Sequence, residues 1–168
     1  LVMEYVEGES LETLIAQGAP KEELLEVLVQ VCEGLGYAHE RGVIHRDVKP
    51  ANILVSRRGR RLHAKLMDFG VALVDQSTLT AAGVWMGTLS YMAPEYLDTG
   101  RASASSDLFA LGVILYEILT GGRKPFTAET STGILNAILR KPADPLGPED
   151  ARGLGPAILD VAGRALAK

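Results

Sequence analysis

The sequence predicts a mainly α-helical domain with one small β-hairpin, and three observations lead to this prediction. Apolar residues recur at helical spacing over most of the chain, two short apolar runs flank a basic turn, and one long stretch is apolar throughout. The 168 residues fit one domain or one large lobe, since domains average about 150 residues. Hydrophobic residues make up 47% and charged residues 23%, which excludes disordered and collagen-like classes.

The N-terminal part of the chain is expected to form a strand and two helices. Residues 1–6 have strand composition, and Ser10 is placed to cap a short helix with its hydroxyl. A longer helix follows, with Pro20 in its first turn and Gly42 placed to end it. The one cysteine, Cys32, falls among the apolar positions of this helix, so we expect a buried core thiol and no disulfide.

The hairpin is predicted from apolar runs at residues 53–55 and 62–67. In the second run Leu62, Ala64 and Leu66 alternate with polar residues, which is the period of a half-buried strand. Residues 56–61 are interpreted as the turn, and they contain four arginines. These arginines could bind an anionic partner or form a solvated loop tip, and the sequence leaves both interpretations open.

The C-terminal half is expected to be helical after one long loop. Residues 75–90 lack any clear period and are interpreted as a loop, and loops longer than about 12–15 residues are usually functional or mobile. Residues 108–119 are apolar on nearly every face, which predicts a helix in the middle of the core, closed by Gly121. Amphipathic patterns predict two more helices at 129–139 and 157–167.

Charge and hydropathy exclude several classes of function. Lys+Arg 17 against Asp+Glu 21 gives a formal charge of -4, which argues against a general nucleic-acid-binding surface. The longest apolar stretch is shorter than the roughly 20 residues that span a bilayer, and Glu117 interrupts it. Without a visible signal peptide or a Cys/His zinc pattern, we expect a cytoplasmic location.

Two polar segments flank the hairpin. They are His-Arg-Asp-Val-Lys-Pro-Ala-Asn at 45–52 and Asp-Phe-Gly at 68–70. Because a hairpin brings its ends together, we expect Asn52 near Asp68, with Asp47 and Lys49 beside them. Asn52 and Asp68 offer the hard oxygen ligands that Mg²⁺ prefers. Lys49 offers a cation for phosphate oxygens and Asp47 a carboxylate to orient a hydroxyl nucleophile, so the set predicts Mg²⁺-dependent phosphoryl transfer.

In their order and spacing, these motifs resemble the eukaryotic-type (Hanks-type) protein kinases. Ala-Pro-Glu at 93–95 and Ser-Asp at 106–107 continue the pattern, and the composition is similar to bacterial members. The family fold is α+β, and residues 1–168 resemble its hinge strand (1–6) and most of its helical C-terminal lobe (7–168). The resemblance therefore also implies a mainly α-helical chain with a small β-hairpin.

The resemblance implies a role for each matching residue. Asp47 would be the catalytic base, and Asn52 and Asp68 would be the metal ligands. Lys49 would contact the γ-phosphate of ATP, and Thr88 would brace Asp47 and Lys49. Lys49 and the pair Gly87-Thr88 resemble the Ser/Thr-specific branch of the family.

The resemblance also implies an adenine site and a structural anchor. Met3 would occupy the gatekeeper position, and the backbone of Glu4 and Val6 would face adenine. Leu54 would form the apolar floor under the ring. Asp107 would hold the backbone of the catalytic loop from below.

Arg46 suggests regulation, because an arginine at this place in kinases can bind a phosphate on the loop that follows. Ser77, Thr78 and Thr80 are candidate phosphate acceptors in that loop. The alternative, exposed hydroxyls with no regulatory role, remains open for each of them.

The implied function is an ATP- and Mg²⁺-dependent protein Ser/Thr kinase whose partners are a protein substrate and ATP. A pseudokinase or scaffold is the alternative, but a scaffold has no chemical reason to keep all four polar residues. A small-molecule phosphotransferase is a third possibility, against which the long loop before Ala-Pro-Glu argues. We expect no nucleic-acid partner, and membrane association only through segments outside these residues.

Two family elements, a Gly-rich phosphate-covering loop and a strand lysine, do not occur in these residues. They belong to the smaller N-terminal lobe, which would precede Leu1. The chain opens within strand composition and stops within a helical pattern, so we expect an excerpt of a longer polypeptide. Alone, these residues are expected to have little or no kinase activity.

Overall fold

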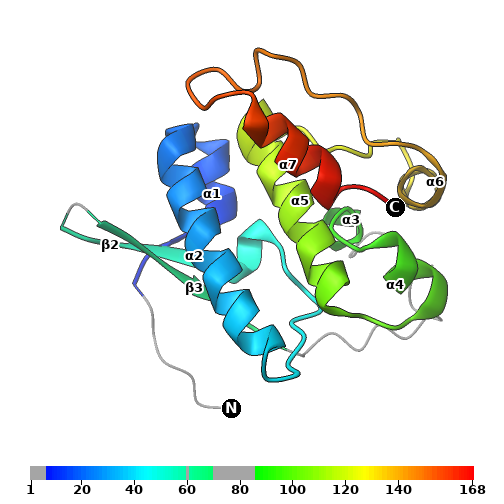
Figure 1. Cartoon of the computed structure of the whole chain (residues 1–168), viewed down its shortest axis with the longest axis horizontal. Helices are drawn as coiled ribbons and strands as arrows, with labels where there is room; N and C mark the ends of the chain where they lie inside the picture. The colour runs from blue at the N-terminus through cyan, green and yellow to red at the C-terminus, as the bar shows by residue number, and fades with distance from the viewer. Residues whose placement is uncertain (1–6, 60, 70–85) are drawn as a thin grey trace.

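Helix α5 runs through the middle of the helical part of the molecule, where it contacts α2, α4 and α7 (Figure 1). The structure, a computed structural model, describes residues 7–59, 61–69 and 86–168. The elements in these ranges are β1 (Glu9–Ser10), α1 (Leu11–Ala16), α2 (Lys21–His39), η1 (Pro50–Asn52), β2 (Ile53–Arg58), β3 (Arg61–Leu66), α3 (Met86–Leu89), α4 (Pro94–Thr99), α5 (Ala104–Thr120), α6 (Ser131–Arg140) and α7 (Ala157–Ala165). The prediction of a mainly helical chain with a small hairpin is confirmed for this part of the chain.

The central position of α5 follows from its composition, because nearly all of its side chains after the first turn are buried. The helix starts earlier than the apolar stretch predicts. Ser103 caps it, and the side chains of Ser103 and Ser106 reciprocally bind each other's backbone N–H groups. Gly121 ends the helix in the left-handed region with φ of 70°, which a glycine adopts without steric cost. A serine capping box therefore fixes the start of this helix, and a glycine fixes its end.

Helices α5 and α7 approach closely at Gly112, and Gly112→Ala is expected to destabilise the fold by about 1–3 kcal/mol. A Cβ at this position would lie 2.8 Å from the Cβ of Ala165 and 3.1 Å from its backbone carbon, so the helices must separate. The matched control is Gly163→Ala in α7, where an added Cβ meets nothing within 4 Å. Urea unfolding compares the two variants, and equal stabilities would contradict the close approach.

Helix α2 packs its apolar face against α5 and β3. The buried positions on this face are Leu24, Val27, Leu28, Val31, Leu35 and Ala38. The prediction of a buried Cys32 thiol is wrong, since Cys32 is exposed. Cys32 follows Val31 by one residue, and one residue turns a helix by about 100°, away from the core-facing side. Gly42, at φ of 73°, reverses the chain shortly after the helix.

The hairpin is confirmed and forms part of a three-stranded antiparallel sheet in the order β1-β2-β3. Its strands pair from Ile53↔Leu66 to Arg58↔Arg61, so most of the segment 56–61 is strand and the predicted turn was too long. The outer edge of β3 is covered by Gln30 of α2. Its side-chain amide donates to the Leu62 carbonyl at 3.0 Å and accepts from the Ala64 N–H at 3.0 Å. These two bonds replace those of a further strand and close the edge.

The remaining predictions differ in detail from the structure. The short helix capped by Ser10 is confirmed, because its hydroxyl accepts from the Thr13 N–H at 3.1 Å. The end of the predicted 75–90 loop is wrong, since α3 begins at Met86. The two C-terminal helices are confirmed with shifted ends. The predicted strand at 1–6 lies outside the described residues. Among the helices of the described residues, none has the length and apolarity needed to cross a bilayer.

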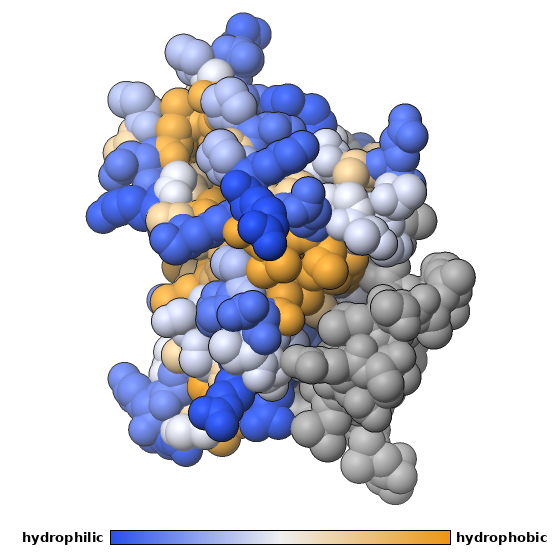
Figure 2. Space-filling model, turned by 90° about the vertical axis from the view of Figure 1, so that its right-hand side faces the viewer, coloured by the Kyte–Doolittle hydropathy of each residue, from blue (hydrophilic) through white to orange (hydrophobic). Residues whose placement is uncertain are grey.

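A groove lined by apolar and charged residues opens where α4, α5, α6 and α7 meet, and its volume is about 700 Å³. Figure 2 shows apolar side chains gathered in the middle of this face, with charged side chains around them. Leu108 lies in the groove and is 52% exposed. None of the candidate site residues lines this groove, so the candidate site is elsewhere.

Candidate functional site

The loop between α2 and β2 brings four of the predicted site residues into one hydrogen-bonded cluster. The Lys49 ammonium lies 2.9 Å from Oδ2 of Asp47 and donates to Oγ1 of Thr88 at 3.2 Å. The Asn52 amide nitrogen donates to both the backbone oxygen and Oδ2 of Asp47, each at 2.8 Å. Thr88 comes from α3, so two distant segments of the chain meet at Lys49.

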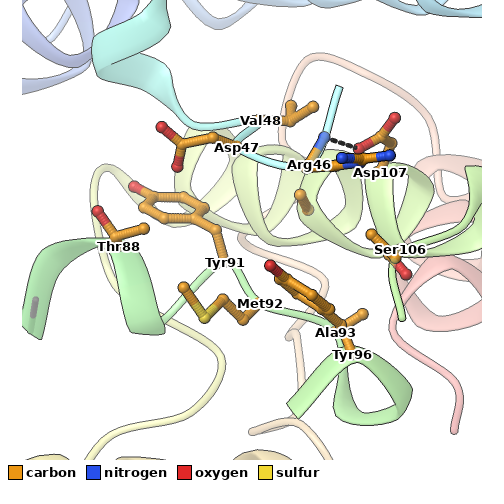
Figure 3. A pocket seen from close by; sticks show the side chains of 12 residues that line it. Arg46, Asp47, Val48, Thr88, Tyr91, Met92, Ala93, Tyr96, Ser106 and Asp107 are labelled. Atoms are coloured by element: carbon orange, nitrogen blue, oxygen red, sulfur yellow. Dashed lines mark hydrogen bonds between the residues drawn. The ribbon is translucent and has the colours of Figure 1, made fainter. Parts of the chain in front are cut away.

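Asp47 and Lys49 are both partly accessible, with side chains 18% and 21% exposed. The Asp47 carboxylate can therefore contact a substrate while the Lys49 ammonium and the Asn52 amide fix its orientation. In Figure 3 Asp47 and Thr88 lie on the same side of a pocket that extends towards the start of α5. Its volume is about 20 Å³, which is too small for a nucleotide, so this pocket is a gap beneath the cluster.

His45 anchors the loop in the core and is fully buried. Its Nε2 donates to the Met67 carbonyl at 2.8 Å, and its Nδ1 accepts from the Asp47 N–H at 3.2 Å. A carbonyl only accepts and an N–H only donates, so these two bonds define a neutral ring. Burial lowers the pKa of His45, although the Met67 carbonyl and the nearby carboxylates oppose this shift. His45 therefore packs in the core and orients the loop.

Asp107 in α5 holds the same loop from the other side. Its Oδ2 accepts from the His45 N–H at 2.9 Å, and its Oδ1 accepts from the Arg46 N–H at 2.9 Å. Nε2 of His39 lies 2.7 Å from Oδ2. Asp107 is only 2% exposed, so its carboxylate depends on these neighbours for hydrogen bonds. The family resemblance points to Asp107 but not to its partner His39.

Backbone strain is concentrated at the two ends of the site. Among the described residues other than glycine, Arg46 and Asp68 are those with positive φ, at 73° and 61°. Such conformations cost about 1–3 kcal/mol each and persist only where surrounding contacts impose them. At Arg46 the bond to Asp107 is one such contact. The strained backbone conformations of Arg46 and Asp68 are therefore part of the geometry of the site.

Asn52 and Asp68 are held next to each other by the end of the sheet. The Met67 N–H donates to the Asn52 carbonyl at 2.9 Å, which continues the β2–β3 pairing to the residue before Asp68. The Asn52 bonds to Asp47 use its side-chain nitrogen, so the amide oxygen is the atom that can face a cation. Asp68 is exposed. An amide and a carboxylate oxygen fit Mg²⁺, which takes its remaining ligands from phosphates and water.

Among the described residues no three His, Cys, Asp or Glu side chains are grouped to hold a metal ion. The predicted donor set is of a different kind, because it has one carboxylate and one amide. A site of this kind depends on phosphate oxygens to complete the coordination, as is usual for Mg²⁺.

Several predicted residues lie outside the described ranges. Met3, Glu4 and Val6 of the expected hinge strand belong to this group, as do Ser77, Thr78 and Thr80. Leu54 lies in β2, where it pairs with Ser10 on one side and Lys65 on the other, and it is half-buried. The ring of Phe69 lies 4.5 Å from that of His45, but the residue is 42% exposed.

A buried polar cluster that no sequence motif predicts lies beside the site. The Tyr91 hydroxyl donates to both oxygens of Glu117, at 3.1 and 3.0 Å, and Lys124 contacts both residues. Burial raises the pKa of Tyr91. A glutamate in an otherwise apolar helix is the signal that points to such a cluster, because a buried carboxylate needs partners. The cluster ties the segment after Thr88 to α5.

A family model described as the protein kinase domain matches residues 1–149 of the chain. Serine/threonine-protein kinase PknB of Mycobacterium leprae is 36% identical over 152 residues, which cover 88% of this chain and 24% of that protein. Serine/threonine-protein kinase PknL of Mycobacterium tuberculosis is 44% identical over 137 residues, with 80% of this chain and 33% of that protein covered.

PknB of Mycobacterium bovis is 36% identical over 174 residues, which cover 100% of this chain and 27% of that protein. The chain thus spans about a quarter to a third of the length of these curated relatives. All three matches include the loop at 45–52 within a bacterial serine/threonine-protein kinase.

Proposed function

This chain belongs to the protein kinase domain family, and from that premise we propose that it is the larger lobe of a Ser/Thr protein kinase. The proposed reaction transfers the γ-phosphate of ATP to a serine or threonine hydroxyl of a protein substrate. The observation that carries the proposal is the cluster in which Lys49 and Asn52 both bind the Asp47 carboxylate and Thr88 binds Lys49.

Each residue of the cluster has a chemical task that its contacts support. Asp47 orients the substrate hydroxyl and accepts its proton, since its carboxylate is accessible and held by fixed donors. Lys49 places a positive charge beside Asp47, where transferred phosphate oxygens need neutralisation. Thr88 keeps the Lys49 ammonium in place through its hydroxyl.

Asn52 and Asp68 would hold Mg²⁺. When bound, the ion neutralises charge on the phosphate oxygens of ATP. In this chain Asn52 has a second task, because its amide nitrogen fixes the orientation of Asp47. Leu54, half-buried in β2, would support the adenine ring, and the hinge residues Met3, Glu4 and Val6 complete the proposed ATP site.

The test is phosphate transfer from radiolabelled ATP to a generic protein substrate. The assay uses a longer polypeptide, in which an N-terminal lobe that contains a Gly-rich loop and a strand lysine precedes residues 1–168. We expect phosphoserine and phosphothreonine, and we expect transfer to stop when EDTA removes Mg²⁺ and to resume when Mg²⁺ is restored. ATP binding without transfer would instead indicate a scaffold, and transfer that survives EDTA would contradict the metal site.

The proposed partners are ATP and a protein substrate, and the proposed location is the cytoplasm. Support for this location comes from the single cysteine, since reducing compartments keep thiols unpaired. Fractionation of cells that express the tagged protein tests the location. The kinase domain should face the cytoplasm in a protease-protection assay.

A further inference from the structure

The end of α2 and the start of α5 meet through a histidine and a buried carboxylate. His39 is the last residue of α2, and Asp107 lies in the first turn of α5. Nε2 of His39 lies 2.7 Å from Oδ2 of Asp107, and the two side chains are 15% and 2% exposed. An ionised carboxylate only accepts hydrogen bonds, so Nε2 carries the proton and donates it to Asp107.

The Asp107 carboxylate binds the chain both before and after the turn that follows α2. His39 binds it before the turn at Gly42, and the N–H groups of His45 and Arg46 bind it after the turn, each at 2.9 Å. Oδ2 accepts from His39 and His45, whereas Oδ1 accepts from the Arg46 N–H (Figure 3). The bond to His39 therefore shares its carboxylate with the backbone of the candidate site.

The bond to His39 restricts the rotation of this carboxylate. The last torsion angle of an aspartate side chain has only broad preferences, so hydrogen bonds decide where its two oxygens point. With Oδ2 held by the His39 ring, Oδ1 stays directed at the Arg46 N–H. Arg46 has a positive φ of 73°, and such a strained conformation persists only where neighbouring contacts impose it. The His39 bond thus helps to keep Arg46 in this conformation.

The conformation of Arg46 determines where the next residue, Asp47, is placed. A change in the φ of Arg46 turns the following peptide and carries the Asp47 carboxylate away from its present position. That carboxylate lies 2.9 Å from the Lys49 ammonium and 2.8 Å from the Asn52 amide nitrogen. A displacement of about 1 Å at a reacting group can cost about 10²-fold in rate.

We propose that His39 is a positioning residue for phosphate transfer, which acts on Asp47 through the Asp107 carboxylate and the backbone of Arg46. The proposal rests on the proposed kinase function and extends it to a residue for which the family resemblance implies no role. The alternative is that the bond between His39 and Asp107 only stabilises the fold. In that case its loss would lower stability without changing the rate of the folded enzyme.

The experiment compares His39→Gln with His39→Asn, which carry the same amide group at different reach. The nitrogen of a glutamine side chain can take the place of Nε2 and donate to Asp107, whereas the shorter asparagine cannot reach it. We use the longer polypeptide of the phosphate-transfer assay. We expect His39→Asn to lower kcat at least about tenfold, the factor that corresponds to one lost bond to a charged group, with KM for ATP unchanged. His39→Gln should keep most of the wild-type kcat.

Gly112→Ala is the control for destabilisation alone. Its added Cβ would meet Ala165 of α7, and the bond between His39 and Asp107 is left intact. Where all variants are folded, as circular dichroism verifies, this control should keep the wild-type kcat. Equal kcat in the two His39 variants would overturn the proposal, and so would an equal loss of kcat in His39→Asn and Gly112→Ala.

Amide hydrogen exchange followed by NMR tests the same contact without turnover. His39→Asn should speed the exchange of the His45 and Arg46 N–H groups at least about tenfold, because one bond that holds their acceptor is lost. Unchanged exchange would overturn the proposal. In the wild type, ¹⁵N NMR should find the His39 proton on Nε2, and a ring protonated only on Nδ1 would overturn the proposal without any variant.

The two readouts separate this proposal from the proposed function. A wild type that transfers no phosphate would contradict the kinase function and with it any role of His39 in transfer. An active wild type with an equally active His39→Asn variant would instead contradict only the role of His39.

Discussion

Asp47→Asn is expected to lower the rate of phosphate transfer by roughly 10²- to 10⁴-fold, the usual contribution of a positioned general base. The amide keeps the shape of the carboxylate and one oxygen that can accept from Asn52 or Lys49. It cannot accept the proton of a substrate hydroxyl, and it loses the charge that pairs with Lys49 at 2.9 Å. The fold should change little, because Lys49 keeps its bond to Thr88 and the Asn52 amide keeps its bond to the backbone oxygen of residue 47.

The measurement is steady-state transfer of radiolabelled phosphate at saturating ATP, in the polypeptide used for the EDTA assay. Asp98→Asn is the matched control, since Asp98 is exposed in α4 and takes no part in the cluster. The control should keep the wild-type rate, and both variants should unfold at the wild-type temperature. If the Asp47→Asn enzyme were as fast as the control, Asp47 would have no role in phosphate transfer.

The elements with strong local signals are predictable from the sequence. Ser10 caps α1 as expected because its hydroxyl needs only a neighbouring N–H, and α5 is buried as expected because almost every residue in it is apolar. Failures occur where tertiary contacts decide the outcome. The strands continue through arginines in the segment 56–61 because partner strands and α2 stabilise them, and no local pattern encodes that support.

The same distinction applies to the candidate site. Asp47, Lys49 and Asn52 are close in sequence, so their proximity is predictable, whereas the bond between Lys49 and Thr88 spans 39 positions. That contact was expected only from the family resemblance. The cluster of Tyr91, Glu117 and Lys124 belongs to no short motif, and the sequence could indicate it only through an unpartnered glutamate in an apolar helix.

Asp107→Ala is expected to destabilise the fold by about 3–5 kcal/mol, because it removes a buried charge whose partners then remain unpaired. The N–H groups of His45 and Arg46 would lose their acceptor, and His39 would lose its partner at 2.7 Å. The loss is a large part of the about 5–15 kcal/mol that stabilises a typical domain. Arg46 would also lose a contact that holds its positive φ.

Urea unfolding of Asp107→Ala and Asp107→Asn measures the effect. The control is Asp160→Ala, since Asp160 is exposed and its ion pair with Arg164 lies on the surface. Asp107→Asn keeps one acceptor oxygen, so its stability should fall between those of the wild type and the alanine variant. Where the asparagine variant folds, its phosphate transfer should still be reduced, because Asp107 fixes the backbone that positions Asp47. An Asp107→Ala variant as stable as the control would mean that the loop is held without Asp107, through contacts such as those of His45 with Met67 and of Lys49 with Thr88.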